Sequence, residues 1–129
     1  MPIVRVEICE GKSPAHKQAI LDGVHAALVE AFKIPDSDRT HLLFELPPSC
    51  FEAAGKSGNA TMVTITAFAG RSREAKKRLY RGIADRLAAS PGITGNDLMI
   101  VLLEPPLEDW GIRGGKPADE ADIGFKVNV

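Results

Sequence analysis

An internal repeat constrains the fold of this chain more than any other feature of the sequence. Residues of the first half recur in the second half at a constant offset of 59 positions, so that Val4 matches Val63 and Phe51 matches Trp110. Between these limits the offset pairs Val6 with Ile65, Gly11 with Gly70, Ser13 with Ser72, Lys17 with Lys76, Leu28 with Leu87, Ile34 with Ile93, Asp38 with Asp97, Glu45 with Glu104 and Pro47 with Pro106. Two copies are too few for a solenoid, so we predict two fused copies of one small structural unit.

Each copy has the pattern of a strand, a helix and a second strand. In the first copy, apolar residues alternate from Pro2 to Cys9, as in a half-buried strand, and Gly11 ends the run. Ser13 is a suitable N-cap for the helix that follows, because its hydroxyl can accept a bond from a free backbone N–H. Apolar residues then recur at helical spacing as far as Phe32, and a second strand is predicted over about 40–46.

These patterns predict an α+β fold in which one domain occupies residues 1–129. The two β-α-β units lie at about 2–47 and 61–106, and the segment between them is rich in Gly, Ser, Ala and Pro, as in a linker. Residues 107–129 form a C-terminal hairpin and tail, whose last residues 125–129 alternate like one more strand.

The two units together predict a four-stranded mixed sheet. Right-handed crossovers place both helices on the same face of such a sheet. The segment 98–103 is apolar at every position, so the opposite face of the sheet must also be covered. No remaining segment of the chain can cover it, and we therefore expect a symmetric oligomer.

Composition narrows the classes of partner. The 16 basic and 17 acidic residues give a net charge of −1, which provides no overall attraction for nucleic acid or a membrane surface. No apolar run is long enough to span a bilayer, and no secretory leader is visible, so we expect a cytoplasmic protein. Cys9 and Cys50 lack the spacing of metal ligands and are interpreted as ordinary thiols.

Pro2 and Asp38 are the candidate catalytic residues. Removal of Met1 would make Pro2 a secondary amine at the start of a strand, and a neutral amine can act as a general base. Proline is also tolerated at a strand start without any catalytic role. Asp38 follows the first helix and could orient a water molecule or a substrate hydroxyl, or serve only as a turn carboxylate.

Basic and aromatic residues supply the candidates for substrate binding. Arg71 precedes the N-cap of the second helix, where a guanidinium and the first helical amides could together hold a carboxylate. Lys12 occupies the equivalent place in the first copy, and Arg73 and His25 are further candidates. Trp110, before a glycine-rich segment, could form one wall of a pocket or anchor the tail. Each of these side chains also has an ordinary structural interpretation, as a solvated cation or a packing residue.

These features together resemble the tautomerase superfamily. Residues 2–13, which begin Pro-Ile-Val and end Glu-Gly-Lys-Ser, resemble the opening of 4-oxalocrotonate tautomerase, and residues 110–115 resemble its aromatic-Gly-Ile-Gly-Gly hairpin. The whole chain is similar to the fused two-unit members of the superfamily, including malonate semialdehyde decarboxylase. The residues that carry this second resemblance are Leu21-Asp22, His25, Phe32 to Pro35, Asp38-Arg39, Gly70-Arg71-Ser72 and Asp109-Trp110.

The resemblance implies a homotrimer, a small carboxylate-bearing substrate, and neither a metal nor an organic cofactor. It implies keto–enol tautomerisation with Pro2 as the acid and base, Arg71 as the carboxylate anchor and Asp38 as a second polar group. Each chain would have one proline site, because Thr61 stands where the second copy would need a proline. Two alternatives are a decarboxylase or hydratase of malonate semialdehyde or a related three-carbon acid, and a trimeric binding protein without significant catalysis.

The chain lacks arginines that its relatives have near the predicted site. The decarboxylase pattern has an arginine where this chain has Ala69, and the related dehalogenases have one where this chain has Phe68. Arg39, Arg73 or Arg113 could supply the missing positive charge.

Overall fold

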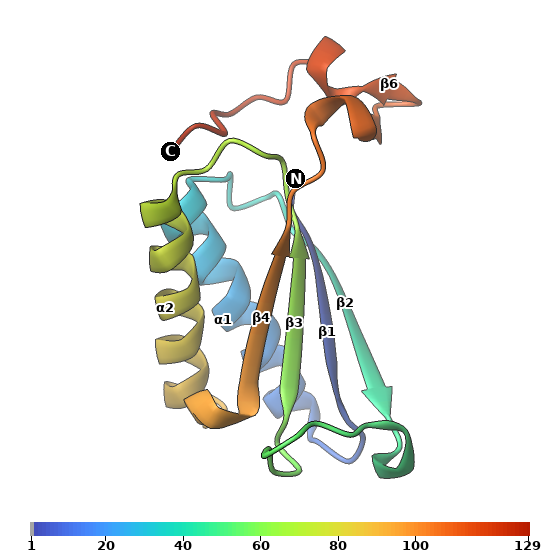
Figure 1. Ribbon diagram of the computed structural model, residues 1–129, viewed down its shortest axis with the longest axis vertical. Helices are drawn as coiled ribbons and strands as arrows, with labels where there is room; N and C mark the ends of the chain where they lie inside the picture. Colours follow the sequence, from blue (N-terminus) through green and yellow to red (C-terminus); the bar gives the residue numbers. More distant parts are fainter. Residues whose placement is uncertain (1) are drawn as a thin grey trace.

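The strands and helices follow one another as the repeat predicts. The computed structural model describes residues 2–129, and Met1, whose removal the sequence predicts, lies outside this range. Two strand–helix–strand units, shown in Figure 1, consist of β1 (Ile3–Cys9), α1 (Pro14–Phe32) and β2 (Thr40–Leu46), then β3 (Thr61–Thr66), α2 (Arg73–Ala89) and β4 (Leu98–Leu103). Short 3₁₀ turns lie at Pro48–Cys50, Gly95–Asp97, Leu107–Asp109 and Ala118–Glu120.

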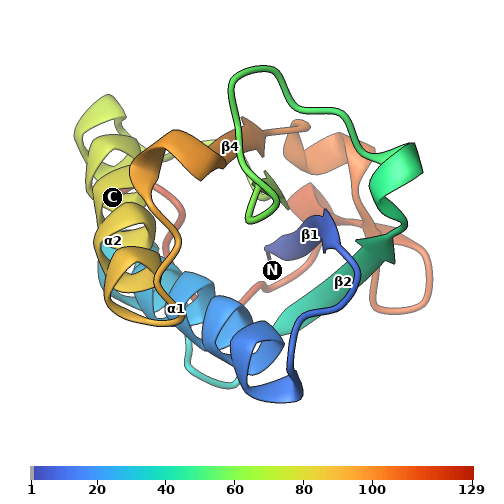
Figure 2. The ribbon, with the colours of Figure 1, turned by 90° about the horizontal axis from the view of Figure 1, so that it is seen from below.

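The four strands form one mixed sheet in the order β2-β1-β3-β4. β1 is parallel to β2 and antiparallel to β3, and β3 is parallel to β4. Both helices cover the same face of the sheet, as the views along and across the strands show (Figure 1, Figure 2). The predicted sheet, its mixed pairing and the placement of the helices are therefore confirmed.

Local sequence explains where the helices begin. The Ser13 hydroxyl accepts a bond from the backbone N–H of His16 at 3.0 Å, and the Ser72 hydroxyl accepts one from Ala75 at 3.1 Å. α1 ends at Lys33, which has the left-handed conformation typical of a helix C-cap, with φ of 57°. Both helices bury an apolar stripe against the sheet, which includes Ile20, Val24, Leu28, Leu79, Ile83 and Leu87.

The opposite face of the sheet is open within this chain. β2 and β4 present large apolar side chains there, with exposed fractions between 37% and 49%: Leu42, Phe44, Met99, Val101 and Leu103. An apolar area of this kind is typical of a protein–protein interface. The expectation that this chain alone does not cover the second face is confirmed.

The C-terminal region forms a small layer over one end of the sheet. β5 (Gly111–Ile112) and β6 (Lys116–Pro117) make the expected hairpin. The predicted final strand is wrong: residues 121–129 form no strand. Alternate tail residues, including Phe125 and Val127, are half-buried against the domain without pairing in a sheet, and this one-sided packing explains the alternation.

None of the helices between residues 2 and 129 is long and apolar enough to cross a membrane.

Candidate active site

Four segments with predicted functional residues meet at one end of the sheet. β1 and β2 begin at this end, and the antiparallel β3 and β4 end there (Figure 1). Ile3 pairs with Thr66 and with Thr40, so the buried Pro2 lies beside the segments that leave β3 and enter β2. The topology therefore gathers Pro2, Asp38, Arg71 and Trp110 at the same end of the molecule.

A small cavity lies at this end. Its volume is about 200 Å³, below the range of about 300–1,000 Å³ that is usual for ligand pockets, and it suits a molecule of a few carbon atoms. Its charged lining residues are Asp38 and Arg113, and the rest are apolar: Pro35, Phe68, Ile112, Ile123 and Phe125. The cavity can thus surround an apolar body and still offer a carboxylate and a guanidinium.

Arg71 is a nearly buried cation with unused hydrogen-bonding capacity. The residue is 6% exposed, and its Nη1 donates to the Phe68 carbonyl at 2.9 Å. The guanidinium carbon lies 4.7 Å from the centre of the Phe32 ring, a cation–π contact. Burial lowers the pKa of Arg71, and the carboxylates of Glu104 and Asp38 oppose that shift. Nε is buried and has no hydrogen-bond partner among residues 2–129, so the described residues leave part of the hydrogen-bonding capacity of this guanidinium unused.

The C-terminal tail packs against the segment that carries Arg71. Phe125 lines the cavity, and its ring centre lies 5.9 Å from the guanidinium carbon of Arg71. The backbone N–H of Ser72, a helix-start amide predicted to bind substrate, instead donates to the main-chain oxygen of Val129 at 2.9 Å. Gly70 permits this approach, because a Cβ there would lie 2.7 Å from Oδ1 of Asn128.

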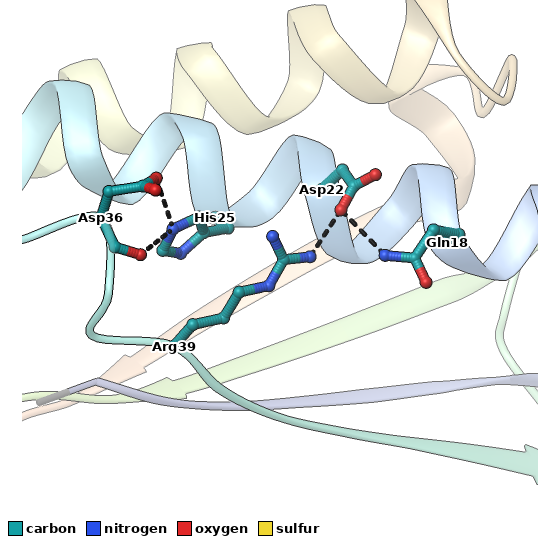
Figure 3. A network of polar contacts seen from close by, with 5 residues as sticks. All are labelled: Gln18, Asp22, His25, Asp36 and Arg39. Atoms are coloured by element: carbon teal, nitrogen blue, oxygen red, sulfur yellow. Dashed lines mark hydrogen bonds and ion pairs between the residues drawn. The ribbon is translucent and has the colours of Figure 1, made fainter.

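The loop that carries Asp38 is tied to α1 (Figure 3). His25 is 5% exposed, and its Nε2 lies 2.9 Å from the Asp36 carbonyl oxygen and 3.2 Å from Oδ1 of Asp36. Arg39 donates to Asp22, which also accepts from Gln18. His25, a predicted substrate-binding residue, is therefore engaged with the loop and does not line the cavity.

Trp110 lies behind the cavity wall. Its ring meets Phe68 edge-on with 4.8 Å between ring centres, and its Nε1 donates to the Pro105 carbonyl at 3.2 Å. Trp110 thus supports a lining residue and anchors the hairpin, the alternative that the sequence left open.

The structure does not bring Lys12 or Arg73 to the cavity. Lys12 lies at the opposite end of the sheet, where β1 ends, and its Nζ donates to Oδ1 of Asn59 at 2.6 Å. It is the repeat equivalent of Arg71, and the antiparallel β1–β3 pairing sends equivalent positions to opposite ends. Arg73 is exposed on the first turn of α2 and does not line the cavity either.

Sequence reasoning missed the apolar lining of the cavity. Ile123 and Phe125 belong to the tail, Pro35 belongs to a loop, and Ile112 belongs to the two-residue strand β5, all of them too irregular or too short for a periodic pattern to reveal burial. The alternation of apolar residues near Phe125 was the sequence pattern that could have revealed this lining. It was interpreted as a strand and not as part of a cavity wall. Among residues 2–129, no group of three or more His, Cys, Asp or Glu side chains is arranged to hold a metal ion.

Comparison with known proteins identifies the family. A family model described as tautomerase enzyme matches residues 38–113, and a second with the same description matches residues 2–60. The probable tautomerase YrdN of Bacillus subtilis (strain 168) is 30% identical over 122 residues, which cover 90% of this chain and 94% of that protein.

Solved structures agree with this assignment. The FG41 malonate semialdehyde decarboxylase inhibited by 3-bromopropiolate is 32% identical, with a TM-score of 0.82 over 94% of this chain and 98% of that one. A wild-type fused 4-OT solved as a symmetric trimer is 30% identical, with a TM-score of 0.81 over 91% of this chain and 96% of that one. With its duplicated β-α-β unit and these matches along both halves, the chain belongs to the tautomerase family.

Proposed function

We propose that this chain is a cofactor-independent tautomerase that acts on a small enol or 2-oxo carboxylic acid. The observation that carries the proposal is the convergence of Pro2, Asp38 and the nearly buried Arg71 at one end of the sheet, next to a cavity of about 200 Å³. After removal of Met1, Pro2 provides a secondary amine at this end. The amine takes the proton from the enol oxygen, the C–O bond becomes a carbonyl, and the electron pair of the C=C bond takes the proton back from the ammonium at the carbon that does not bear the oxygen. One group thus serves as base and then as acid.

Two cations hold the substrate in this proposal. Arg71 is assigned to the carboxylate, because its nearly buried guanidinium lies at this end of the sheet and donates a bond to the Phe68 carbonyl of the cavity wall. Of the three candidates for a second cation, Arg39 is engaged with Asp22 and Arg73 lies outside the cavity. Arg113 lines the cavity together with Asp38 and is therefore assigned to the second oxygen of the substrate.

The assembly proposed for this chain is a homotrimer. Its apolar open face, formed by Leu42, Phe44, Met99, Val101 and Leu103, requires a cover that a second copy of the same face can supply. The fused 4-OT that resembles this chain was solved as a trimer. Each chain would then contribute one proline site.

A decarboxylase or hydratase of malonate semialdehyde or a related acid is the second candidate. It is favoured by the 32% identity to a malonate semialdehyde decarboxylase and by the presence of Asp38 in the cavity wall. Enolate-like charge develops on a second oxygen in such a reaction, and the loss of one stabilising donor typically lowers the rate by about 10²–10³-fold. Ala69 and Phe68 provide no cation where the relatives have one, so stabilisation of that charge would depend on Arg113 alone, which favours tautomerisation.

A comparison of substrates tests the proposal. We expect kcat/KM for phenylenolpyruvate or 2-hydroxymuconate to exceed that for malonate semialdehyde, and Arg71→Ala mainly to raise KM for the enol acid. The proposal fails if malonate semialdehyde is the better substrate. Absence of turnover with all three acids would favour the trimeric binding protein.

A further inference from the structure

We propose that His25 is a positioning residue for Asp38, which it holds in the cavity wall by fixing the loop between α1 and β2. The loop, residues 33–39, carries Asp38 and connects α1 to β2. Figure 3 shows two of its residues, Asp36 and Arg39, in contact with side chains of α1. The inference deepens the proposed function, since it matters for catalysis only if Asp38 acts on the substrate.

The direction of the bond at His25 follows from its partner. The Asp36 carbonyl oxygen can only accept, so Nε2, at 2.9 Å, carries the proton and donates. The same nitrogen lies 3.2 Å from the Asp36 carboxylate, whose side chain is otherwise 92% exposed. A buried helix residue therefore holds the backbone of a loop that projects into solvent.

The other ring nitrogen of His25 is enclosed. Nδ1 is buried without a hydrogen-bond partner among residues 2–129. His41 meets the ring edge-on, with 5.7 Å between ring centres. Burial and then the nearby Arg39 lower the pKa of His41 to about 4, so His41 adds no positive charge here near neutral pH. The ring is thus fixed in place, and its polar contact within the described chain is with Asp36.

In the sequence, Asp38 lies between two residues whose contacts hold the loop: Asp36, which bonds to His25, and Arg39, which bonds to Asp22. The backbone N–H of Asp38 donates to the Pro35 carbonyl at 3.0 Å, which closes a turn. On the far side, Arg39 donates to Asp22, but these side chains are 35% and 57% exposed and the pair is weakened by solvent. The bond from His25, whose ring is 5% exposed, is therefore less weakened by solvent than the Arg39–Asp22 pair and restrains the loop that carries Asp38.

Kinetics of paired variants test the inference. His25→Phe retains a ring but removes the donor, and a displacement of about 1 Å at a catalytic group can lower the rate by roughly 10²-fold. We expect His25→Phe to lower kcat/KM for an enol acid by about ten- to a hundredfold, mostly in kcat. His25→Gln, whose amide N–H has similar reach, should restore most of the activity. His16→Phe on the same helix, whose side chain makes no hydrogen bond within residues 2–129, is the matched control and should behave as wild type.

A double-mutant cycle separates positioning from general damage to the fold. If His25 acts through Asp38, His25→Phe combined with Asp38→Asn should be no slower than Asp38→Asn alone. Additive losses would overturn the inference. So would equal losses in His25→Phe and His25→Gln.

Hydrogen exchange provides a readout that does not depend on the proposed reaction. His25→Phe should accelerate exchange of the amides of residues 34–40 and leave those of β1 and β3 unchanged. Unchanged exchange in this loop would contradict the inference whatever the activity. Faster exchange in the loop, together with full activity of Asp38→Asn, would instead contradict the proposed role of Asp38.

Discussion

At the scale of single residues, charge placed against apolar surface is the main determinant of the site. Arg71 is buried over the Phe32 ring, and Arg113 borders a cavity that is otherwise apolar except for Asp38. Arg71 is 6% exposed and does not line the cavity, whereas Arg113 lines it and is exposed, so the roles proposed for them, carboxylate anchor and second cation, must be tested separately.

Arg113 is the cation whose removal tests this arrangement. It lies in the tight turn after β5 with φ of 49°, and it lines the cavity beside Asp38. We expect Arg113→Ala to lower kcat/KM for an enol acid by about 10²-fold, the usual effect of losing one preorganised donor. Arg73→Ala, which removes an exposed arginine outside the cavity, is the matched control. Equal effects of the two substitutions would show that general positive charge, and not the position of Arg113, is what matters.

At the scale of elements, the sequence predicts the repeated units well and the tail poorly. The strands and helices recur at one offset, and both helices have serine caps that the sequence identifies, Ser13 and Ser72. The strand prediction for the tail is wrong because alternating apolar residues indicate burial on one side only. An extended segment can be buried in this way without pairing in a sheet. Packing of this kind depends on contacts with Gly70, distant in the sequence, and no local pattern encodes them.

Gly70 is the position where this contact can be tested. Its φ of 132° is unfavourable for any other residue, and a Cβ would lie 2.7 Å from Asn128 and 3.0 Å from Val127. We expect Gly70→Ala to lower the free energy of unfolding by about 1–3 kcal/mol, measured by urea denaturation. Gly58→Ala is the control, because a Cβ there would meet no atom within 4 Å beyond its chain neighbours and its φ is not positive. A Gly70→Ala protein as stable as Gly58→Ala would mean that the tail does not pack there in solution.

At the scale of the whole molecule, the repeat explains both the symmetry of the fold and the asymmetry of its chemistry. Equivalent positions lie at opposite ends of the sheet, so Lys12 cannot join Arg71 at one site within a chain. The residue patterns indicated Pro2, Asp38, Arg71 and Trp110 as separate candidates, and the resemblance to the superfamily implied that the first three share a site. In the structure, the strand order brings all four to one end of the sheet. The sequence could not predict that His25 bonds to the loop. Helical spacing predicts which face of α1 is buried, but it does not predict the hydrogen-bond partner of a polar atom on that face.

The open face of the sheet gives a prediction about assembly. Val101 lies on β4 and is 43% exposed within one chain. Burial of a charged ammonium in an apolar interface is unfavourable, so Val101→Lys should convert a trimer into smaller species, as measured by light scattering. Ala88→Lys, on the exposed side of α2, should leave the assembly unchanged. A wild-type protein that remains monomeric at micromolar concentration would contradict the proposed trimer.

The measurement that most directly tests the proposed mechanism is kcat/KM of Pro2→Ala for phenylenolpyruvate, with the intact mass of both proteins determined beforehand. Wild-type protein should have a mass without Met1, since only then is the Pro2 nitrogen an amine. The variant should remain folded and lose about 10²–10⁴-fold in kcat/KM, the range for loss of a general acid–base group. A Pro2→Ala protein with the activity of wild type, or an active wild type that retains Met1, would contradict the account.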